Sequence, residues 1–445
     1  MKKKVLIFFF ALLLGIIGYS FFTFFEQTPP SGEWQNRSNY LSNGTILRIS
    51  VSDIGRGLNR VEITYHQGKN IFPLHLENYS DRETALKKAA FEIPVDLKKL
   101  GIKDGEGVIA INIQDRSLWN FAKGNSTSLK YAVAVDTKPP LVTILTTDHV
   151  VIQGGSEITV YKASADTVTT GVKVGEYFFP GHKGTFEDEN TYLAFFSYPY
   201  NLPPGEPIFI IAQDGAGNTV KKNLSILVKP KRYRNRTIKL TDKFLRRKLP
   251  ELISIANLEE SGDLLKDFLF VNREVRGQQD EKIKIITKDS KPELMWKGGF
   301  LQLRNAKVES RFADFRTYTY NGKVVDEKYH LGFDLAATKR YPIGASNTGL
   351  VVFADNLGIY GNSVIIDHGF GIFTLYSHMN SIDVNEGDRV EKGAVIGKTG
   401  ETGLAGGDHL HFGVLIHGTP VTPIEWWDKK WVKNRILRRI KAAED

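Results

Sequence analysis

The stretch GGDHLHFGVLIHG, residues 406–418, holds three of the chain's ten histidines within nine positions. Alternate side chains of a β-strand point to the same face, so His409 and His411 share one face while Leu410 and Phe412 share the other. The Cα atoms of the two histidines should lie about 6.6 Å apart, which lets both side chains reach one zinc ion. Alternatively, one histidine binds a metal and the other faces a substrate.

A second candidate pair lies in YHLGFDLA, residues 329–336, where His330 and Asp334 are four positions apart. On a straight strand these two residues would be roughly 13 Å apart. They could therefore share one metal only if the backbone bends between them. Gly332 permits such a bend, because glycine has no Cβ to restrict its backbone.

A third segment, IFTLYSHMN at residues 372–380, is predicted to be a strand. Alternation predicts that Tyr376 and His378 project from one face, where Tyr376 could help to orient a site around His378. His368 precedes this strand at a predicted hairpin turn, so we expect it to be structural.

The sequence contains no cysteine, so any zinc must be held by His, Asp or Glu. If His409, His411, His330 and Asp334 all bind, the site is closed and structural. Three ligands and a water make it catalytic. Spacing alone leaves both arrangements open. His417 is expected outside the site, because a straight strand would place it about 20 Å from His411.

Taken together, HLGFD, LYSH and GDHLHFGV resemble the zinc metallopeptidases of the lysostaphin and LytM kind, which are peptidoglycan endopeptidases. SRFADFR (310–316), the glycine-rich turns of 384–412 and VTPIEWW (421–427) resemble the same family. The resemblance covers about 300–427. It implies a β-rich, LytM-type peptidase domain with an antiparallel sheet over residues 298–427.

The resemblance implies that His330, Asp334 and His411 bind one Zn²⁺, with water in the fourth position. It also implies that His378 and His409 are the catalytic pair. Zinc would lower the pKa of the water, and histidines would serve as acid and base because the sequence has no H-E-x-x-H motif. The implied function is hydrolysis of peptidoglycan cross-links. The alternative is a non-catalytic relative that activates a cell-wall amidase, but the five intact positions favour the enzyme.

The N-terminal segment VLIFFFALLLGIIGYSFFTFF, residues 5–25, carries no charge and follows three lysines. As a helix it would span about 31 Å, roughly the thickness of a bilayer core. The lysines should stay in the cytoplasm. We therefore expect residues 1–30 to be a single-pass anchor in the inner membrane, with the catalytic domain outside. A cleaved signal peptide with secretion to the periplasm is the alternative.

Residues 31–229 are rich in short β-type runs. IAINIQDRSLWN (109–120) is echoed about a hundred residues later by IFIIAQDGAGNT (208–219). An all-strand repeat of this length predicts two β-sandwich modules, at residues 31–137 and 138–229. The D-x-x-G-N pattern resembles bacterial immunoglobulin-like modules. The fold class is therefore expected to be mainly β.

Residues 230–297 are predicted to be a short helical connector, with Thr241 as a helix cap. This connector, or a β module, could also cover the cleft and inhibit the enzyme. Residues 428–445 are predicted to be a basic helix, and its seven lysines and arginines from 429 to 441 are expected to form a solvated face or to contact an anionic wall or membrane.

The net charge of +9 and the pI of about 9.2 favour anionic surroundings. The expected partners are peptidoglycan peptides, the inner membrane and other cell-wall proteins that contact the β modules. We expect no nucleic-acid partner.

Overall fold

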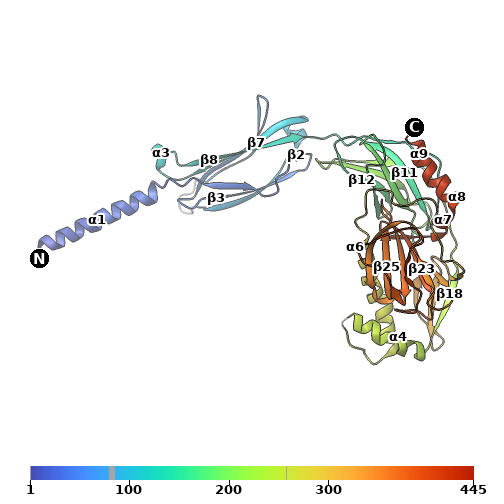
Figure 1. Cartoon of the computed structure of the whole chain (residues 1–445). Coiled ribbons are helices and arrows are strands. Elements are labelled where there is room, and N and C mark those ends of the chain that lie inside the picture. The colour runs from blue at the N-terminus through green and yellow to red at the C-terminus, as the bar shows by residue number, and fades with distance from the viewer. Residues whose placement is uncertain (1, 80–85, 257, 445) are drawn as a thin grey trace. The chain divides into compact units, whose positions relative to one another are not determined.

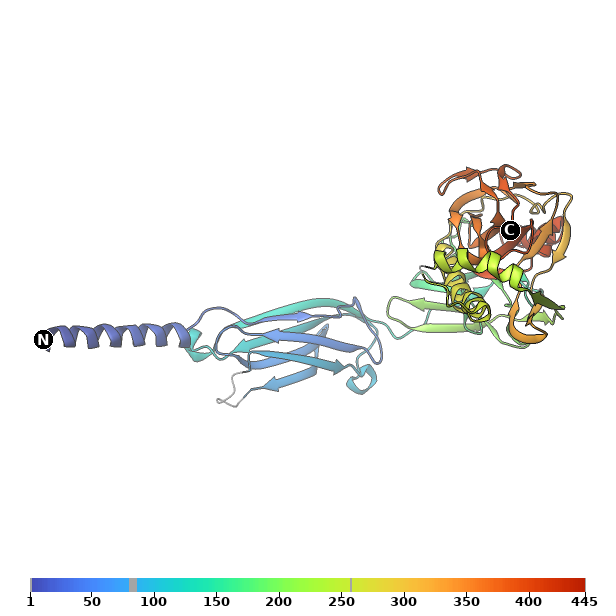
Figure 2. The ribbon, with the colours of Figure 1, turned by 90° about the horizontal axis from the view of Figure 1, so that it is seen from below.

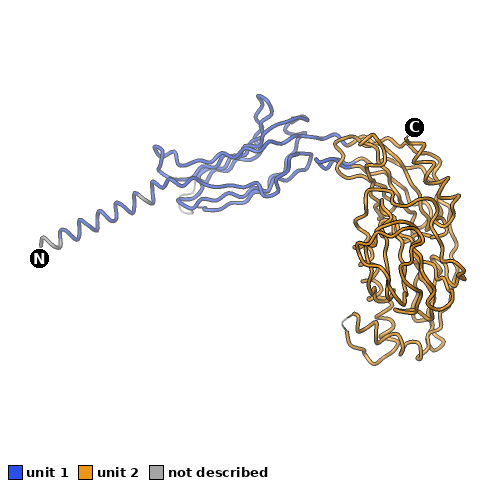
Figure 3. Tube along the Cα trace, viewed as in Figure 1, with its two compact units in different colours: residues 1–139, 213–219 blue, residues 140–212, 220–445 orange. Residues whose placement is uncertain are grey.

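The computed structural model describes the chain over residues 2–79, 86–256 and 258–444. It forms two compact units, unit 1 with residues 1–139 and 213–219 and unit 2 with residues 140–212 and 220–445 (Figure 3). Strands make up most of the regular structure in both units (Figure 1). The prediction of a mainly β fold is confirmed.

Helix α1 (Lys2–Phe24) begins unit 1. Among the residues that the structure describes, no helix is both long and apolar enough to cross a membrane. The N-terminal transmembrane helix predicted for residues 5–25 is therefore not confirmed.

The rest of unit 1 is built on two sheets that share one core (Figure 2). The first has the order β1 (Ser31–Trp34), β3 (Ile46–Ser52), β6 (Lys88–Pro94). The second has the order β2 (Tyr40–Leu41), β8 (Ser126–Val135), β7 (Gly105–Asp115), β4 (Leu58–Gln67), β5 (Asn70–Asn78). Ile49 of the first sheet and Ile63 and Ile111 of the second are fully buried between them. The result is a β-sandwich, whereas its immunoglobulin-like character is not confirmed.

Short helices α2 (Leu97–Leu100) and α3 (Trp119–Ala122) flank β7 in the sequence. A second set of strands follows, which belongs to unit 2 except for residues 213–219. It forms three sheets: β9 (Val142–Ile144), β11 (Ser156–Ala163) and β14 (Thr191–Ser197); β12 (Thr167–Val174), β13 (Tyr177–Pro180), β15 (Ile208–Asp214) and β16 (Thr219–Asn223); and β10 (His149–Ile152) with β17 (Ile226–Lys229). The core of this second set of strands continues into the C-terminal domain, which comprises residues 298–427. The ring of Phe195 in β14 lies 6.3 Å from that of Trp426 in this domain.

The C-terminal helical segment packs on this second set of strands. It consists of α7 (Pro423–Trp427), α8 (Lys429–Trp431), η3 (Val432–Leu437) and α9 (Arg438–Ala442), and it lies beside β11 (Figure 1). Arg435 binds the buried carboxylate of Glu157 at 2.9 Å, and Arg439 also pairs with it. The expectation of a solvated basic face is therefore wrong for these two arginines, because a buried partner neutralises them.

A stacked histidine pair also joins the second set of strands to the C-terminal domain. His182 and His417 lie with Nε2 atoms 3.2 Å apart and ring centroids 5.1 Å apart. The ring of Phe370 packs 5.2 Å from that of His182. Burial lowers the pKa of His182 to about 4, and burial together with His182 lowers the pKa of His417 to about 3. Both rings are therefore neutral at pH 7.

We expect the stability of unit 2 to fall as the pH drops from about 6.5 to about 3, because the folded pKa is about 4 for His182 and about 3 for His417. The unfolded histidines bind protons near pH 6.5 while the folded ones do not, so acid favours the unfolded chain. His182 alone should cost about 2 kcal/mol at pH 5 relative to pH 7.5. Thermal unfolding of wild type and of His182→Gln at both pH values measures this. The variant should lose less stability on acidification, and His66→Gln in unit 1 is the control. An unchanged pH dependence in His182→Gln would contradict the prediction.

The C-terminal domain is centred on a large antiparallel sheet with the order β19 (Lys307–Ser310), β22 (Phe333–Ala336), β30 (Leu410–Ile416), β26 (Ile372–Met379), β25 (Asn362–Asp367), β24 (Gly349–Asn356), β28 (Arg389–Val390). Strand β31 (Thr419–Val421) pairs with β30. A smaller sheet has the order β23 (Pro342–Gly344), β29 (Val395–Lys398), β27 (Ser381–Ile382). Strands β26 and β30 are buried throughout, so both faces of the sheet are covered in the middle.

Residues 230–297 are not wholly helical. They begin with β18 (Asn235–Leu240), which forms a sheet with β20 (Phe315–Tyr320) and β21 (Lys323–Tyr329). Helices α4 (Asp242–Ile255), α5 (Leu264–Phe270), η1 (Val271–Val275) and α6 (Arg276–Ile286) follow, and Thr241 caps α4 by accepting a hydrogen bond from Phe244 N. Phe268 of α5 shares a core with Phe373 and Leu415 of the large sheet. We call α4 to α6 the helical arm.

Candidate active site

Neighbouring strands bring three potential metal ligands together. Asp334 of β22 is directly opposite His411 of β30, and His330 reaches the same point from the segment between β21 and β22. Nε2 of His330 lies 2.9 Å from Oδ1 of Asp334 and 2.9 Å from Nδ1 of His411. Nδ1 of His411 lies 3.0 Å from Oδ1 of Asp334. The three buried side chains thus converge on one point.

The backbone around His330 explains how it reaches this point. Its Nδ1 donates a hydrogen bond of 3.0 Å to the carbonyl oxygen of Arg311, which leaves Nε2 as the nitrogen with a free lone pair. The peptide groups of His330 and Ala313 are also hydrogen-bonded. At Gly332, a Cβ would lie 2.6 Å from Nε2 of His411. Glycine is therefore needed here for close approach, and the bend expected between His330 and Asp334 is present.

The charges of the three side chains suit a divalent metal. Burial alone would raise the pKa of Asp334, but the neighbouring histidines hold it well below its usual value, so the group is a carboxylate. Its Oδ2 also pairs with Arg316 at 2.7 Å. Burial lowers the pKa of His330 to about 4 and lowers that of His411. Two neutral imidazoles and one carboxylate are a donor set that zinc binds, so these residues fit a zinc ion.

His378 and His409 lie beside the convergent group. The ring of His378 is 4.9 Å from that of His409 and 5.8 Å from that of His411. Nδ1 of His378 donates to the carbonyl of Thr402 at 2.9 Å, and Nδ1 of His409 donates to that of Gly407 at 2.8 Å. In both rings Nε2 is therefore the nitrogen that can accept or deliver a proton, and that of His409 lies 3.5 Å from Oδ1 of Asp334. Burial lowers the pKa of His378 well below its usual value, so this ring is neutral.

The expectation that Tyr376 and His378 share a face is wrong. Tyr376 is opposite Phe412 in the register of β26 and β30, and its hydroxyl accepts a hydrogen bond of 2.7 Å from Ser346 N in the core. A β-bulge sets Ser377 and His378 together against one residue of β25, and His378 has φ +63. The bulge turns His378 to the face of His411, and such a backbone is characteristic of functional sites.

Two other histidines lie away from this group. His368 is buried, with Nδ1 donating to the carbonyl of Thr348 at 2.8 Å and Nε2 bonded to Thr374 at 2.8 Å, so it is structural as expected. His417 pairs with His182 instead.

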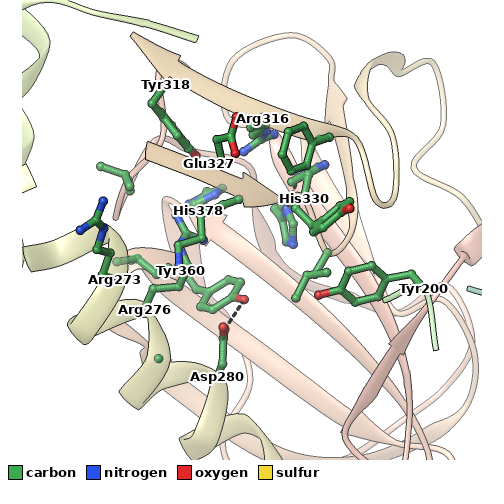
Figure 4. Close-up of a pocket in the computed structure, with 18 residues that line it drawn as sticks. Tyr200, Arg273, Arg276, Asp280, Arg316, Tyr318, Glu327, His330, Tyr360 and His378 are labelled. Carbon is green, nitrogen blue, oxygen red and sulfur yellow. Dashed lines mark hydrogen bonds between the residues drawn. The ribbon is translucent and has the colours of Figure 1, made fainter. Parts of the chain in front are cut away.

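A cavity of about 470 Å³ opens onto the site (Figure 4). Sequence reasoning missed Tyr360, whose ring lies 5.8 Å from that of His411 and whose hydroxyl donates to Asp280 of the arm at 2.8 Å. The arm also contributes Arg276, and the second set of strands contributes Tyr200. Contacts between segments that are far apart in the sequence bring these residues to the cavity, so no local sequence pattern could have identified them. Within the described part of the chain, the convergent ligand group contains no arm residue.

The pattern of peptidase family M23 matches residues 328–423, a segment that contains all five histidine and aspartate positions of the site. The C-terminal domain belongs to peptidase family M23. The resemblance to the lysostaphin and LytM kind is thereby confirmed. The M23 domain provides the sheet, the convergent group and the two flanking histidines, whereas the arm that lines the cavity lies outside the matched segment.

Named relatives of the M23 domain share this segment. DD-carboxypeptidase/endopeptidase Mpg of Neisseria meningitidis serogroup B is 42% identical over 97 residues, which are 22% of this chain and 22% of that protein. Peptidoglycan DD-endopeptidase ShyA of Vibrio cholerae is 34% identical over 119 residues, which are 27% of each chain. The chain thus spans about a quarter of the length of these relatives. The catalytic domain of lysostaphin from Staphylococcus simulans has 25% identity and a TM-score of 0.25, covering 29% of this chain and 98% of that one.

Proposed function

We propose that this chain is a zinc-dependent endopeptidase that hydrolyses peptide cross-links of peptidoglycan. The observation that carries the proposal is the convergence of His330, Asp334 and His411 beside two further histidines at an accessible cavity. The names of the M23 relatives include DD-endopeptidases, which supports a bond between two D-centres as the target. We assign the D-alanine–diaminopimelate cross-link as the substrate.

His330, Asp334 and His411 would hold the zinc ion. Zinc bound there supplies Lewis-acid chemistry for attack of water on an amide. Nε2 is the nitrogen available for proton transfer in both His378 and His409, since their Nδ1 atoms bind backbone carbonyls, and the two rings lie 4.9 Å apart. One ring takes a proton from the attacking water and the other delivers a proton to the leaving amine.

The same proposal places the M23 domain outside the inner membrane, with residues 1–30 as the anchor. It is supported by the uncharged run that follows three lysines. Fractionation of cells that carry the full chain, or a chain that starts at residue 31, tests this placement. Recovery of both in the same soluble fraction would contradict it.

We expect the purified full chain to carry about one zinc per molecule and to release new peptide ends from isolated cell walls, because its ligand set is complete. Metal analysis and mass spectrometry of the digest measure both. Walls cross-linked through diaminopimelate should be cut, and walls cross-linked through glycine bridges should not. Zinc-free protein with no new peptide ends would contradict the proposal and would favour a non-catalytic regulator.

A further inference from the structure

The end of the unit 1 sandwich next to α1 holds three converging carboxylates. Glu26 follows α1, Asp53 follows β3 and Asp115 ends β7. One carboxylate oxygen from each lies within 4.8 Å of the others. Asp53 and Asp115 are 4% and 1% exposed, so two of the three groups are buried together at close range.

Two oxygens of this cluster lack hydrogen-bond partners. Across the described residues, no donor contacts Oδ1 of Asp53 or Oε1 of Glu26, although both atoms are buried. Oδ2 of Asp53, by contrast, accepts a hydrogen bond of 2.6 Å from Gly57 N. A buried carboxylate oxygen is costly unless a donor or a metal ion satisfies it. Burial, followed by the adjacent carboxylates, raises the pKa of Glu26, and burial raises that of Asp53, which shows how closely these groups crowd.

The surrounding backbone is shaped to hold the carboxylates. A Cβ at Gly55 would lie 2.3–2.7 Å from the Glu26 carboxylate, so a glycine leaves room for it. Asp115 accepts hydrogen bonds from Asn125 N and from Asn125 Nδ2, both of 2.8 Å. The same Nδ2 donates to the carbonyl of Glu26 at 3.0 Å. One asparagine therefore binds both the Asp115 carboxylate and the main-chain carbonyl of Glu26.

The chain repeats this clamp. Asp214 accepts hydrogen bonds of 2.8 Å and 2.9 Å from the backbone and side chain of Asn218, and that side chain donates to the carbonyl of Asp136 at 3.1 Å. The acidic residue begins EQTPP at 26–30 in one case and DTKPP at 136–140 in the other. The acidic residue and its Asp–Asn clamp thus occur at both positions of the internal repeat.

We propose that Glu26, Asp53 and Asp115 form a Ca²⁺ site that fastens the segment after α1 to the sandwich. The available ligands are all oxygens, and carboxylates can bind in the bidentate way that Ca²⁺ accepts, whereas zinc prefers nitrogen or sulfur. The site lies at the joint itself. Leu118 N donates to the carbonyl of Phe24 at 2.7 Å, and Ser117 Oγ donates to that of Glu26 at 2.6 Å. Bound Ca²⁺ therefore stabilises this joint, independently of any peptidase activity.

The test uses the purified full chain, freed of divalent metals and then supplied with one equivalent of zinc. Calorimetric titration with CaCl₂ should show binding to wild type, and Ca²⁺ should raise the unfolding temperature of unit 1 more than the same concentration of Mg²⁺ does. Asp53→Asn keeps the shape of the side chain and removes its charge. It should lose one equivalent of bound Ca²⁺ or weaken its binding at least 10-fold. Calcium bound elsewhere would add to the total without changing this difference.

Glu106→Gln, an exposed carboxylate of the same sandwich, is the matched control and should bind Ca²⁺ as wild type does. Circular dichroism checks that each variant is folded. If Asp53→Asn fails to fold, Glu26→Gln, which changes a less buried side chain, provides the same comparison. Calcium binding that is absent in wild type, or unchanged in a folded variant, would overturn the proposal.

Discussion

Replacement of His411 with alanine is expected to remove the bound zinc and to abolish cell-wall hydrolysis. Nδ1 of His411 lies 2.9 Å from His330 and 3.0 Å from Asp334, so its loss leaves two of the three proposed protein ligands. Two ligands do not hold zinc against dilution. Changes to residues outside the ligand shell cost about 10–100-fold in metal affinity, and the loss of a ligand should exceed this. Zinc content falls from about one per chain to background, together with the rate of peptide release.

His182→Gln provides the matched comparison for His411→Ala. It removes another histidine of unit 2, which is half-buried and whose partner is His417 and not the convergent group. It should keep its zinc at neutral pH. Zinc content equal to wild type in a folded His411→Ala variant would contradict the assignment of His411 as a ligand.

Replacement of His409 with alanine is expected to have the opposite signature, with zinc retained and hydrolysis lost. Nδ1 of His409 is occupied by the carbonyl of Gly407, and its ring lies against that of His378 and not within the convergent group. Loss of a proton-transferring histidine typically costs about 10²–10⁴-fold in rate. Zinc analysis and the rate of peptide release, measured on one preparation, give both values. His378→Ala should behave in the same way.

This comparison separates the two histidines of one strand. Nε2 of His409 lies 3.5 Å from Oδ1 of Asp334, so a role for His409 as a fourth ligand is the competing arrangement. A parallel loss of zinc in His409→Ala would support that arrangement and would contradict the proposed catalytic role.

The sequence could predict the members of the site but not all of their orientations. His409 and His411 follow the alternation of a strand, which is a local property of the backbone. The same rule failed for Tyr376, because a β-bulge at His378 interrupts the alternation and turns the histidine over. Such a bulge depends on pairing with β25, which the spacing of residues in β26 does not reveal.

Pairing between distant segments also explains the other differences. Strand β18 pairs with β20, which lies about 80 residues later. The local sequence of residues 230–297 therefore predicts the helices but not this strand. The sequence of the basic C-terminal segment predicts a solvated face, because Glu157, which pairs with Arg435 and Arg439, lies about 280 residues earlier in the chain. Tyr360 lines the cavity, where its hydroxyl donates a hydrogen bond to Asp280 of the helical arm.

The sequence by itself determined that the C-terminal domain belongs to the M23 family and which five histidine and aspartate positions form its motifs. Short motifs and strand alternation depend only on a few neighbouring residues. Only the tertiary structure decided which atoms meet. His330 and His411 are 81 positions apart, and their nitrogens approach to 2.9 Å because β22 pairs with β30 and Arg311 holds one ring. Strand register and loop contacts arise from packing across the whole domain, and no single segment contains them.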